Sequence, residues 1–433
     1  MTNRERSLGY IVFLSFVAAI GGILFGYDTA VISGTTEIVK AQFGLSTGLE
    51  GWFVGCALIG SIVGVMVAGM LSDFLGRKKT MLIAALMFSV SAIGCAVCGN
   101  FSQLVVYRMI GGFGIGVVSI VSPIYISEVA PAEKRGTLVS LYQLFITIGF
   151  LLAYLMNYLI LRGAATDATG AELGARMFNQ EYWRGMFGCE AIPDLLFLVL
   201  IFFIPESPRW LAIRGQRQDK SEEWKALREP GILKAVLIGS AIAILGQFMG
   251  VNAVLYYGPK IFQDAGLSGE GSMFSTVLVG VVNMLTTVIA LLIIDKVGRK
   301  KLVWWGVGGM IVCLLCIGTW FAVGTLPTWF LLTFFLLYVF CTAISISAVV
   351  FVLLSEMYPN RVRGLAMSIA GLALWVGTYL IGQLTPWMLE NLTPAGTFFL
   401  FAFCCLPYLY IMWKYIPETT GKTLEEIEAY WKK

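Results

Sequence analysis

Twelve apolar stretches run through this chain of 433 residues, and each is long enough to cross a lipid bilayer as a helix. A spanning helix needs roughly 20 predominantly apolar residues. The stretches cover residues 8–33, 50–71, 80–99, 102–125, 137–161, 183–204, 233–257, 272–294, 302–323, 328–354, 364–386 and 395–416. The long alternating segments of a transmembrane barrel do not occur in the sequence, so we predict an all-α membrane protein with twelve transmembrane helices.

The composition excludes several classes of protein. Hydrophobic residues make up 58% of the chain and charged residues 13%, whereas soluble domains are about 45–50% apolar and about 25% charged. A soluble enzyme, a disordered protein and a secreted disulfide scaffold are therefore ruled out. The chain contains no histidine, which is the usual proton shuttle and the commonest metal ligand. Proton chemistry must then use carboxylates, and we expect no metal site.

Nine cysteines lie in or beside the apolar stretches. Cys95 and Cys98, like Cys313 and Cys316, have the CxxC spacing of redox and metal sites. The alternative is that they are small apolar packing residues. Because both pairs lie inside hydrophobic runs, we favour packing.

The distribution of basic residues predicts the orientation in the membrane. Of the 30 Lys and Arg residues, 24 lie at the termini and in alternate loops, and Arg108 lies inside a stretch. The opposite loops, with the stretch ends beside them, carry only Lys40, Arg162, Arg176, Arg184 and Lys260. Positive residues are retained in the cytoplasm, so both termini are predicted to be cytoplasmic. The first stretch is long and carries Asp28, so we expect no cleavable signal.

Three short signatures occur twice, in the same order. They are Asp73-Phe-Leu-Gly76-Arg77-Lys78 with Asp295-Lys-Val-Gly298-Arg299-Lys300, the pair Glu128 and Arg135 with the pair Glu356 and Arg363, and Pro205-Glu206-Ser207 with Pro417-Glu418-Thr419. Such repetition indicates two six-helix halves. We predict an N-terminal half at 1–204, a cytoplasmic linker at 205–232, a C-terminal half at 233–416 and a cytoplasmic tail with a short amphipathic helix at 417–433.

The chain resembles the sugar porter family of the major facilitator superfamily over nearly its whole length. The resemblance rests on Arg108-Met-Ile-Gly111-Gly112, Tyr125-Ile-Ser-Glu128 with Arg135, PESPRWL at 205–211 and PETTG at 417–421. The segment Phe25-Gly26-Tyr27-Asp28-Thr29-Ala30-Val31 is most similar to the bacterial D-xylose–proton symporters. This resemblance implies the major facilitator fold, with two pseudo-symmetric halves.

Eight charged residues lie at helix ends beside short loops predicted to be cytoplasmic. They are Asp73, Arg77, Glu128, Arg135, Asp295, Arg299, Glu356 and Arg363. They either hold the loops inside by their charge or form interhelical ion pairs that close the cytoplasmic side and open during transport. Their repetition in both halves favours a gate, and the family resemblance implies the same role.

Four ionisable residues lie inside the apolar stretches and away from their ends, where a charge costs at least about 2.5–3.5 kcal/mol and marks a functional candidate. They are Asp28, Arg108, Glu190 and Asp194. Asp28 and Arg108 form either a proton-coupling pair, which we favour, or a permanent salt bridge. In the symporters that the chain resembles, the matching aspartate carries the proton, the matching arginine tunes it, and Glu190 matches an acidic residue. Asp194 departs from the family and is either an extra protonatable site or a residue facing a cavity.

Sugars are recognised by amide hydrogen bonds to hydroxyls and by aromatic faces against the ring. The candidate substrate-binding residues are Phe25, Gln143, Gln247, Asn252, Tyr256, Asn283 and Trp375. A single buried amide can also join helices, but the Gln247–Asn252 cluster with Gln143 favours binding, and the sugar contacts of the family match these positions.

Three residues depart from the family pattern at this site. Gly246 replaces the first of two glutamines, Phe351 replaces a tryptophan, and Leu374 replaces a glutamine. Each lost hydrogen bond removes about 1–3 kcal/mol of discrimination. Xylose or glucose binds less well to such a site, or the substrate is a less hydroxylated solute.

The favoured function is proton-coupled symport of a monosaccharide, a D-xylose-like pentose or hexose, by alternating access across the cytoplasmic (inner) membrane. We expect a monomer in the lipid bilayer, with the proton as coupling ion and no other cofactor. The alternatives are a passive sugar uniporter and a transport-dead sugar sensor. An enzyme is not expected, because the sequence has no histidine cluster, nucleophile elbow or phosphate loop, and no feature favours nucleic-acid binding.

Overall fold

The structure, a computed structural model, describes residues 8–131, 134–164, 177, 180–213, 221–359, 362–418 and 424–431. These residues form helices and short connections, without strands. Twelve helical segments are long and apolar enough to cross a membrane. The prediction of an all-α protein with twelve transmembrane helices is therefore confirmed.

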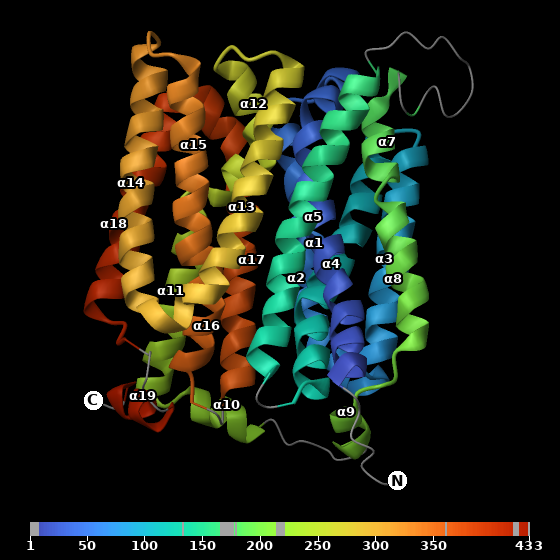
Figure 1. Cartoon of the computed structure of the whole chain (residues 1–433), viewed down its shortest axis with the longest axis vertical. Coiled ribbons are helices and arrows are strands. Elements are labelled where there is room, and N and C mark those ends of the chain that lie inside the picture. Colours follow the sequence, from blue (N-terminus) through green and yellow to red (C-terminus); the bar gives the residue numbers. More distant parts are fainter. Residues whose placement is uncertain are drawn as a thin grey trace. The chain divides into compact units, whose positions relative to one another are not determined.

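The helices of the N-terminal part are mostly long (Figure 1). They are α1 (Leu8–Phe43), α2 (Thr47–Leu75), α3 (Arg77–Val97), α4 (Phe101–Val129), α5 (Arg135–Ala164), α7 (Tyr182–Gly188) and α8 (Ala191–Phe203). Two short helices, α9 (Pro208–Ile213) and α10 (Ser221–Leu227), lie in the segment predicted to be a linker.

The C-terminal part contains six further spans, two of them broken. Its helices are α11 (Pro230–Phe248), α12 (Val251–Asp264), α13 (Gly269–Val297), α14 (Arg299–Val323), α15 (Thr328–Thr342), α16 (Ala348–Met357), α17 (Arg363–Asn391), α18 (Thr393–Lys414) and α19 (Leu424–Trp431). A π-helical segment, η3 (Ala343–Ser347), joins α15 to α16. Single π turns inside helices are frequent at functional sites.

Several helices extend beyond the apolar stretches that predict them. The stretch 8–33 belongs to α1, which continues to Phe43 through polar residues. There the hydroxyls of Thr35 and Thr36 donate to the Ile32 carbonyl, at 3.0 and 2.7 Å. Polar side chains that bond their own helix are tolerated in its interior, so hydropathy alone ends the helix too early.

The chain divides into two compact units. The first comprises Met1–Leu45 and Cys56–Gln216, and the second comprises Ser46–Gly55 and Arg217–Lys433. Within the first, α1 packs against α4 and α5, and α3 against α4 and α8 (Figure 1). Within the second, α11 packs against α17 and α18, and α14 against α15 and α18. The domain boundaries inferred from sequence, at 204 and 233, remain a prediction.

The C-terminal tail carries the expected amphipathic helix, α19, which packs against α16 and α11. Ile427 and Trp431 are buried on its inner face, whereas Glu426 is exposed. The apolar residues are four positions apart and therefore share one face.

The first turns of α2 belong to the second unit through polar contacts with α12 and α17. Glu50 is fully buried, and its Oε1 lies 2.6 Å from Nζ of Lys260 in α12. Thr47 donates a hydrogen bond to Glu390, and Gln383 Nε2 donates to the Gly48 carbonyl at 3.1 Å. The sequence predicted Lys260 only as a loop charge, because both partners lie at the ends of apolar stretches.

We predict that Lys260→Met destabilises the protein, because it leaves the buried Glu50 carboxylate without its ammonium partner. Removing one partner of a fully buried pair costs about 3–5 kcal/mol, and we expect less here because the Lys260 side chain is 18% exposed. Thermal unfolding in detergent should show a lower midpoint for this variant. The double variant Glu50→Leu/Lys260→Met should recover most of the loss. A single variant as stable as wild type would contradict this account.

Candidate functional site

A buried ion pair joins α1 to α4 in the first unit. Asp28 and Arg108 are 1% and 2% exposed. Arg108 Nη1 donates to the Asp28 carboxylate and also to the Asp28 carbonyl, at 3.2 Å. The guanidinium carbon lies 5.4 Å from the ring centroid of Phe187 in α7, within the range of a cation–π contact. The structure thus brings together the two residues predicted to form the proton-coupling pair.

Two further carboxyls lie near this pair, where α7 meets α8. Glu190 is 2% exposed and Asp194 is 0% exposed. The Asp194 amide donates to the Glu190 carbonyl at 3.2 Å, so the two residues lie one helical turn apart. Glu190 is close enough to Asp28, Asp194 and Arg108 for their charges to interact. Both residues therefore belong to the same charged cluster.

The seventh span is broken next to its amides. α11 ends at Phe248 and α12 begins at Val251, with Gly250 between them at φ 90°. This left-handed conformation favours glycine, and a Cβ here would lie 2.4 Å from Phe401 Cδ2. Discontinuous helices of this kind form the binding sites of many transporters.

Three side chains of the second unit form an amide cluster at this break. Asn252 Nδ2 donates to Gln247 Oε1 at 2.6 Å, and Thr378 Oγ1 of α17 donates to the same oxygen at 3.1 Å. Gln247 and Asn252 are half-buried. Within the described part of the chain, the Gln247 nitrogen and the Asn252 oxygen make no hydrogen bond. The cluster therefore offers one donor group and one acceptor to a polar ligand.

The other predicted substrate residues lie on helices that pack against each other within each unit. Tyr256 in α12 and Trp375 in α17 are buried, and Asn283 in α13 is half-buried. α12 packs against both α13 and α17. Phe25 in α1 and Gln143 in α5 are half-buried in the first unit, on helices that pack against each other.

The three departures from the family pattern have different surroundings. A Cβ added at Gly246 would meet Ile346 Cγ2 at 3.6 Å and Tyr408 Cε2 at 3.8 Å, which are ordinary van der Waals contacts. Leu374 is half-buried beside Trp375. The side chain of Phe351 lies outside the described part of the structure.

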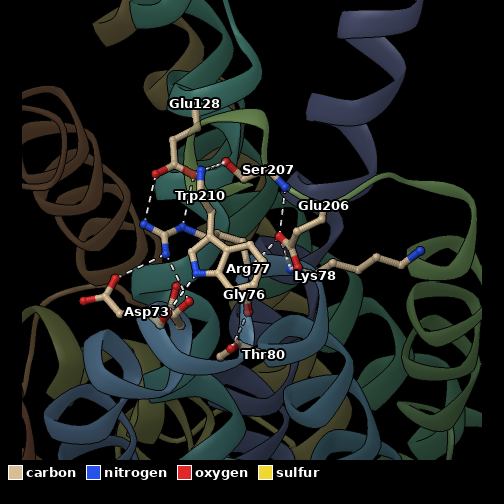
Figure 2. Close-up of polar contacts among 10 residues, drawn as sticks. Asp73, Gly76, Arg77, Lys78, Thr80, Glu128, Glu206, Ser207 and Trp210 are labelled. Atoms are coloured by element: carbon tan, nitrogen blue, oxygen red, sulfur yellow. Dashed lines mark hydrogen bonds and ion pairs between the residues drawn. The ribbon is translucent and has the colours of Figure 1, made fainter. Parts of the chain in front are cut away.

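A second charged group, the Arg77 cluster, consists of Asp73, Arg77, Glu128, Glu206 and Ser207 (Figure 2). Arg77 donates through Nη2 and Nε to the Glu128 carboxylate, at 3.0 and 3.1 Å, and through Nη1 to Asp73 at 3.2 Å. Ser207 Oγ donates to the same Glu128 carboxylate. The bidentate pair fixes both position and orientation of the guanidinium.

Glu206, which follows α8 in the chain, caps the first turn of α3. Its carboxylate accepts hydrogen bonds from the backbone amides of Arg77, at 2.9 Å, and Lys78, at 3.1 Å. A carboxylate at a helix N-terminus satisfies free N–H groups and interacts favourably with the helix dipole. Gly76 permits this approach, because its φ is 97° and a Cβ would lie 2.3 Å from Glu206 Oε2 (Figure 2).

The second unit repeats this arrangement in an Arg299 cluster, formed by Arg299, Glu356 and Glu418. Arg299 Nη2 donates to Glu356 at 2.9 Å. Glu418 accepts from the backbone amides of Arg299, at 3.1 Å, and Lys300, at 3.2 Å. Sequence reasoning did not place Glu206 and Glu418 among the gate residues, although the third repeated signature, Pro-Glu-Ser or Pro-Glu-Thr, contains them.

The remaining predicted gate residues, Arg135, Asp295 and Arg363, do not belong to either cluster as described. Arg363 at the start of α17 makes no ion pair among the described residues; its Nη2 donates to the Tyr358 carbonyl, in the connection that precedes its own helix, at 3.2 Å. Its place in the gate stays a prediction. The side chains of Arg135 and Asp295 lie outside the described part of the structure.

Twelve spanning helices, a buried ion pair inside the bundle and paired charge clusters at helix ends define a multi-pass membrane transporter. The family model "Sugar (and other) transporter" matches residues 14–230 and 216–431. The chain therefore belongs to the sugar transporter family.

Known relatives match over nearly their whole length. The arabinose–proton symporter of Bacillus subtilis is 37% identical, covering 100% of this chain and 97% of the relative. The D-xylose–proton symporter of Escherichia coli is 36% identical, covering 99% and 97%. The structure of the Escherichia coli xylose transporter in its inward-open conformation is 37% identical, with a TM-score of 0.83 over 98% of this chain and 100% of that chain. The chain has the major facilitator fold.

We predict that Gly76→Ala destabilises the Arg77 cluster. Non-glycine residues in this backbone region cost about 1–3 kcal/mol, and the added methyl would also push away the Glu206 carboxylate. Thermal unfolding in detergent should show a lower midpoint. Gly69→Ala in α2 is the control, because a Cβ there meets nothing within 4 Å, and it should unfold no earlier than wild type. Equal unfolding midpoints for the two variants would refute the claim that Gly76 is needed for Glu206 to cap α3.

Proposed function

We propose that the protein is a proton-coupled symporter of a monosaccharide, a D-xylose-like pentose or hexose, that works by alternating access. The observation that carries the proposal is the buried Asp28–Arg108 pair. Whole-length similarity to relatives named as arabinose–proton and D-xylose–proton symporters supports the same function. We further propose a monomer in the inner membrane, with both termini cytoplasmic.

Asp28 is proposed to bind the coupling proton. A buried carboxylate is tolerated only when a cation or a proton neutralises it. Arg108 provides that cation in this structure, so a movement that separates the two residues must be accompanied by protonation of Asp28. Glu190, which also interacts with both charges, is proposed to adjust this exchange. No cofactor other than the proton is required.

The amide cluster is proposed to bind the sugar. The free donor of Gln247 and the free acceptor of Asn252 match a sugar hydroxyl, which both donates and accepts. Thr378 and Asn252 already hold Gln247 Oε1, so little side-chain entropy is lost on binding. We propose Phe25, Gln143, Tyr256, Asn283 and Trp375 as further sugar contacts.

The Arg77 and Arg299 clusters are proposed to act as the cytoplasmic gate. Each cluster ties the beginning of one helix to the ends of others within its unit, through charged hydrogen bonds. Such contacts stabilise one state of a two-state transporter without touching the substrate.

We predict that Asp28→Asn abolishes sugar accumulation but retains exchange of labelled for unlabelled sugar, because exchange needs no net proton movement. The test uses proteoliposomes with an inside-alkaline pH gradient and labelled D-xylose or L-arabinose. With one proton per sugar, a gradient of one pH unit sustains about tenfold accumulation in the wild type. Thr35→Val is the control, because Thr35 is buried in the same helix and, among the described residues, its hydroxyl bonds only the Ile32 carbonyl.

The outcomes separate the alternatives. Uptake that equilibrates without accumulation would indicate a passive uniporter, in which Asp28–Arg108 is a permanent salt bridge. Sugar binding without uptake would indicate a sensor. Accumulation by Asp28→Asn equal to that of wild type would remove Asp28 from the proton pathway.

We predict that Gly246→Gln tightens D-xylose binding, because it restores the first glutamine of the family pattern where a Cβ fits without overlap. One additional hydrogen bond contributes about 0.5–1.5 kcal/mol, which corresponds to a dissociation constant lower by about two- to tenfold. Calorimetric titration measures the effect. Gly246→Ala adds the Cβ without the amide and should bind like wild type; an equal gain in both variants would exclude a role for the amide.

A further inference from the structure

Asp194 is a buried carboxyl that takes no part in the Asp28–Arg108 ion pair. It lies in the first turn of α8 and is 0% exposed. Among the described residues, neither of its carboxylate oxygens has a hydrogen-bond partner. A buried acid with no donor beside it requires a physical explanation.

The elements around Asp194 bring several titratable groups near it. α8 packs against α1 and α3, and α1 in turn packs against α4. Asp194 is close enough to Asp28 for their charges to interact, and Glu190 interacts with both. The titratable and charged groups that face Asp194 and its neighbours are Tyr27, Asp28, Cys56, Cys95, Arg108, Cys189 and Glu190.

The charges of this cluster do not balance when every acid is ionised. Asp28, Glu190 and Asp194 are three carboxyls, and Arg108 is the one cation among the groups that face them. Arg108 is already bonded to Asp28 through its Nη1. One arginine balances only one of the three carboxylates, and each further buried anion would cost several kcal/mol. Protons on the other two acids would remove this cost, and Asp194, whose oxygens have no donor among the described residues, is the strongest candidate to hold one.

We propose that Asp194 is a second proton-binding site, which keeps a proton ready for Asp28 while Arg108 holds Asp28 ionised. This inference rests on the proposed proton-coupled function. When the Asp28–Arg108 pair separates, the proton moves from the Asp194 carboxyl to the Asp28 carboxylate. Asp194 is then ionised until it takes up a proton from water. The number of protons is unchanged in the transfer, and one is gained in the refilling.

This proposal predicts the outside pH at which net uptake depends on Asp194. At acidic outside pH, Asp28 is protonated readily from water without a neighbouring donor. At alkaline outside pH, protons are scarce, and a donor already inside the protein speeds the loading of Asp28. Asp194 should therefore affect net uptake at alkaline pH and leave sugar exchange unchanged.

The first experiment detects the proton directly, by infrared spectroscopy of the purified protein in lipid. Asp194→Asn should lose a protonated-carboxyl C=O band that Asp28→Asn and Glu190→Gln retain. An unchanged band would show that Asp194 is ionised and would overturn the proposal. This measurement does not depend on transport, so it remains valid if the symport function itself is wrong.

The second experiment compares net uptake and exchange in proteoliposomes across outside pH. Asp194→Asn should slow gradient-driven uptake at alkaline pH by at least about tenfold, since positioned proton-transfer groups contribute about 10²–10⁴-fold. Exchange should stay at the wild-type rate, and Asp194→Glu, which keeps an acid, should restore uptake. A uniform loss of uptake and exchange, repeated in the similarly branched but apolar Asp194→Leu, would show a structural role only. Unchanged uptake at every pH would also refute the proposal.

Failure of the proposed symport function and failure of the Asp194 proposal give different results. If wild-type uptake does not respond to the proton gradient, the proposed symport function is wrong. If the wild type accumulates sugar and Asp194→Asn does so equally at all pH values, only the role of Asp194 is wrong.

Discussion

Every polar group inside a helical membrane protein must find its partner within the protein, because the bilayer core offers no water. The polar contacts within each unit follow from this constraint. Asp28 is accommodated because Arg108 of α4 donates to it, and the Gln247 oxygen is accommodated because Asn252 and Thr378 donate to it. The same requirement applies at helix ends, where Glu206 and Glu418 satisfy the first amides of α3 and α14. The Asp194 carboxyl and the amide cluster keep unsatisfied polar atoms among the described residues, and there a proton and a sugar are proposed to bind.

The duplicated clusters show how an internal repeat preserves a geometry. In both units a turn ending in glycine, at φ 97°, places an arginine where its side chain reaches a glutamate of another span and its backbone amide reaches a second glutamate. The details differ: Lys78 Nζ donates to one carbonyl, of Phe202, whereas Lys300 Nζ donates to those of Trp413 and Ile416. The backbone cap by a distant carboxylate is common to both units, which indicates that the fixed start of α3 and α14 is the shared requirement.

Sequence alone predicted the twelve spans and the Asp28–Arg108 pair, because lipid demands long apolar segments and penalises unpaired charges. It did not predict where α1 ends. Thr35 and Thr36 are polar, so hydropathy places them outside the helix, but their hydroxyls bond a carbonyl of their own helix. The π segment Ala343–Ser347 contains neither proline nor glycine and gives no local signal. Glu206 and Glu418 were visible as repeated residues, but their bonds go to backbone amides, which side-chain patterns do not show. Glu50 and Lys260 are far apart in the chain, and only folding pairs them.

The charged cluster and the amide cluster lie in different units of the chain, which bears on how coupling must operate. Asp28, Arg108, Glu190 and Asp194 belong to the first unit, and Gln247, Asn252 and Thr378 to the second. In the proposed function, the amides bind the sugar and Asp28 binds the proton, so the two ligands are held by different residues. The two binding events are then linked through the conformational equilibrium of the whole protein: each ligand favours the state in which its own site is satisfied. Reciprocity requires that protonation of Asp28 strengthens sugar binding by the same factor by which sugar strengthens proton binding. A buried ion pair suits this role, because separating it without a proton is so costly that the state without Arg108 at Asp28 is reached only when Asp28 is neutral.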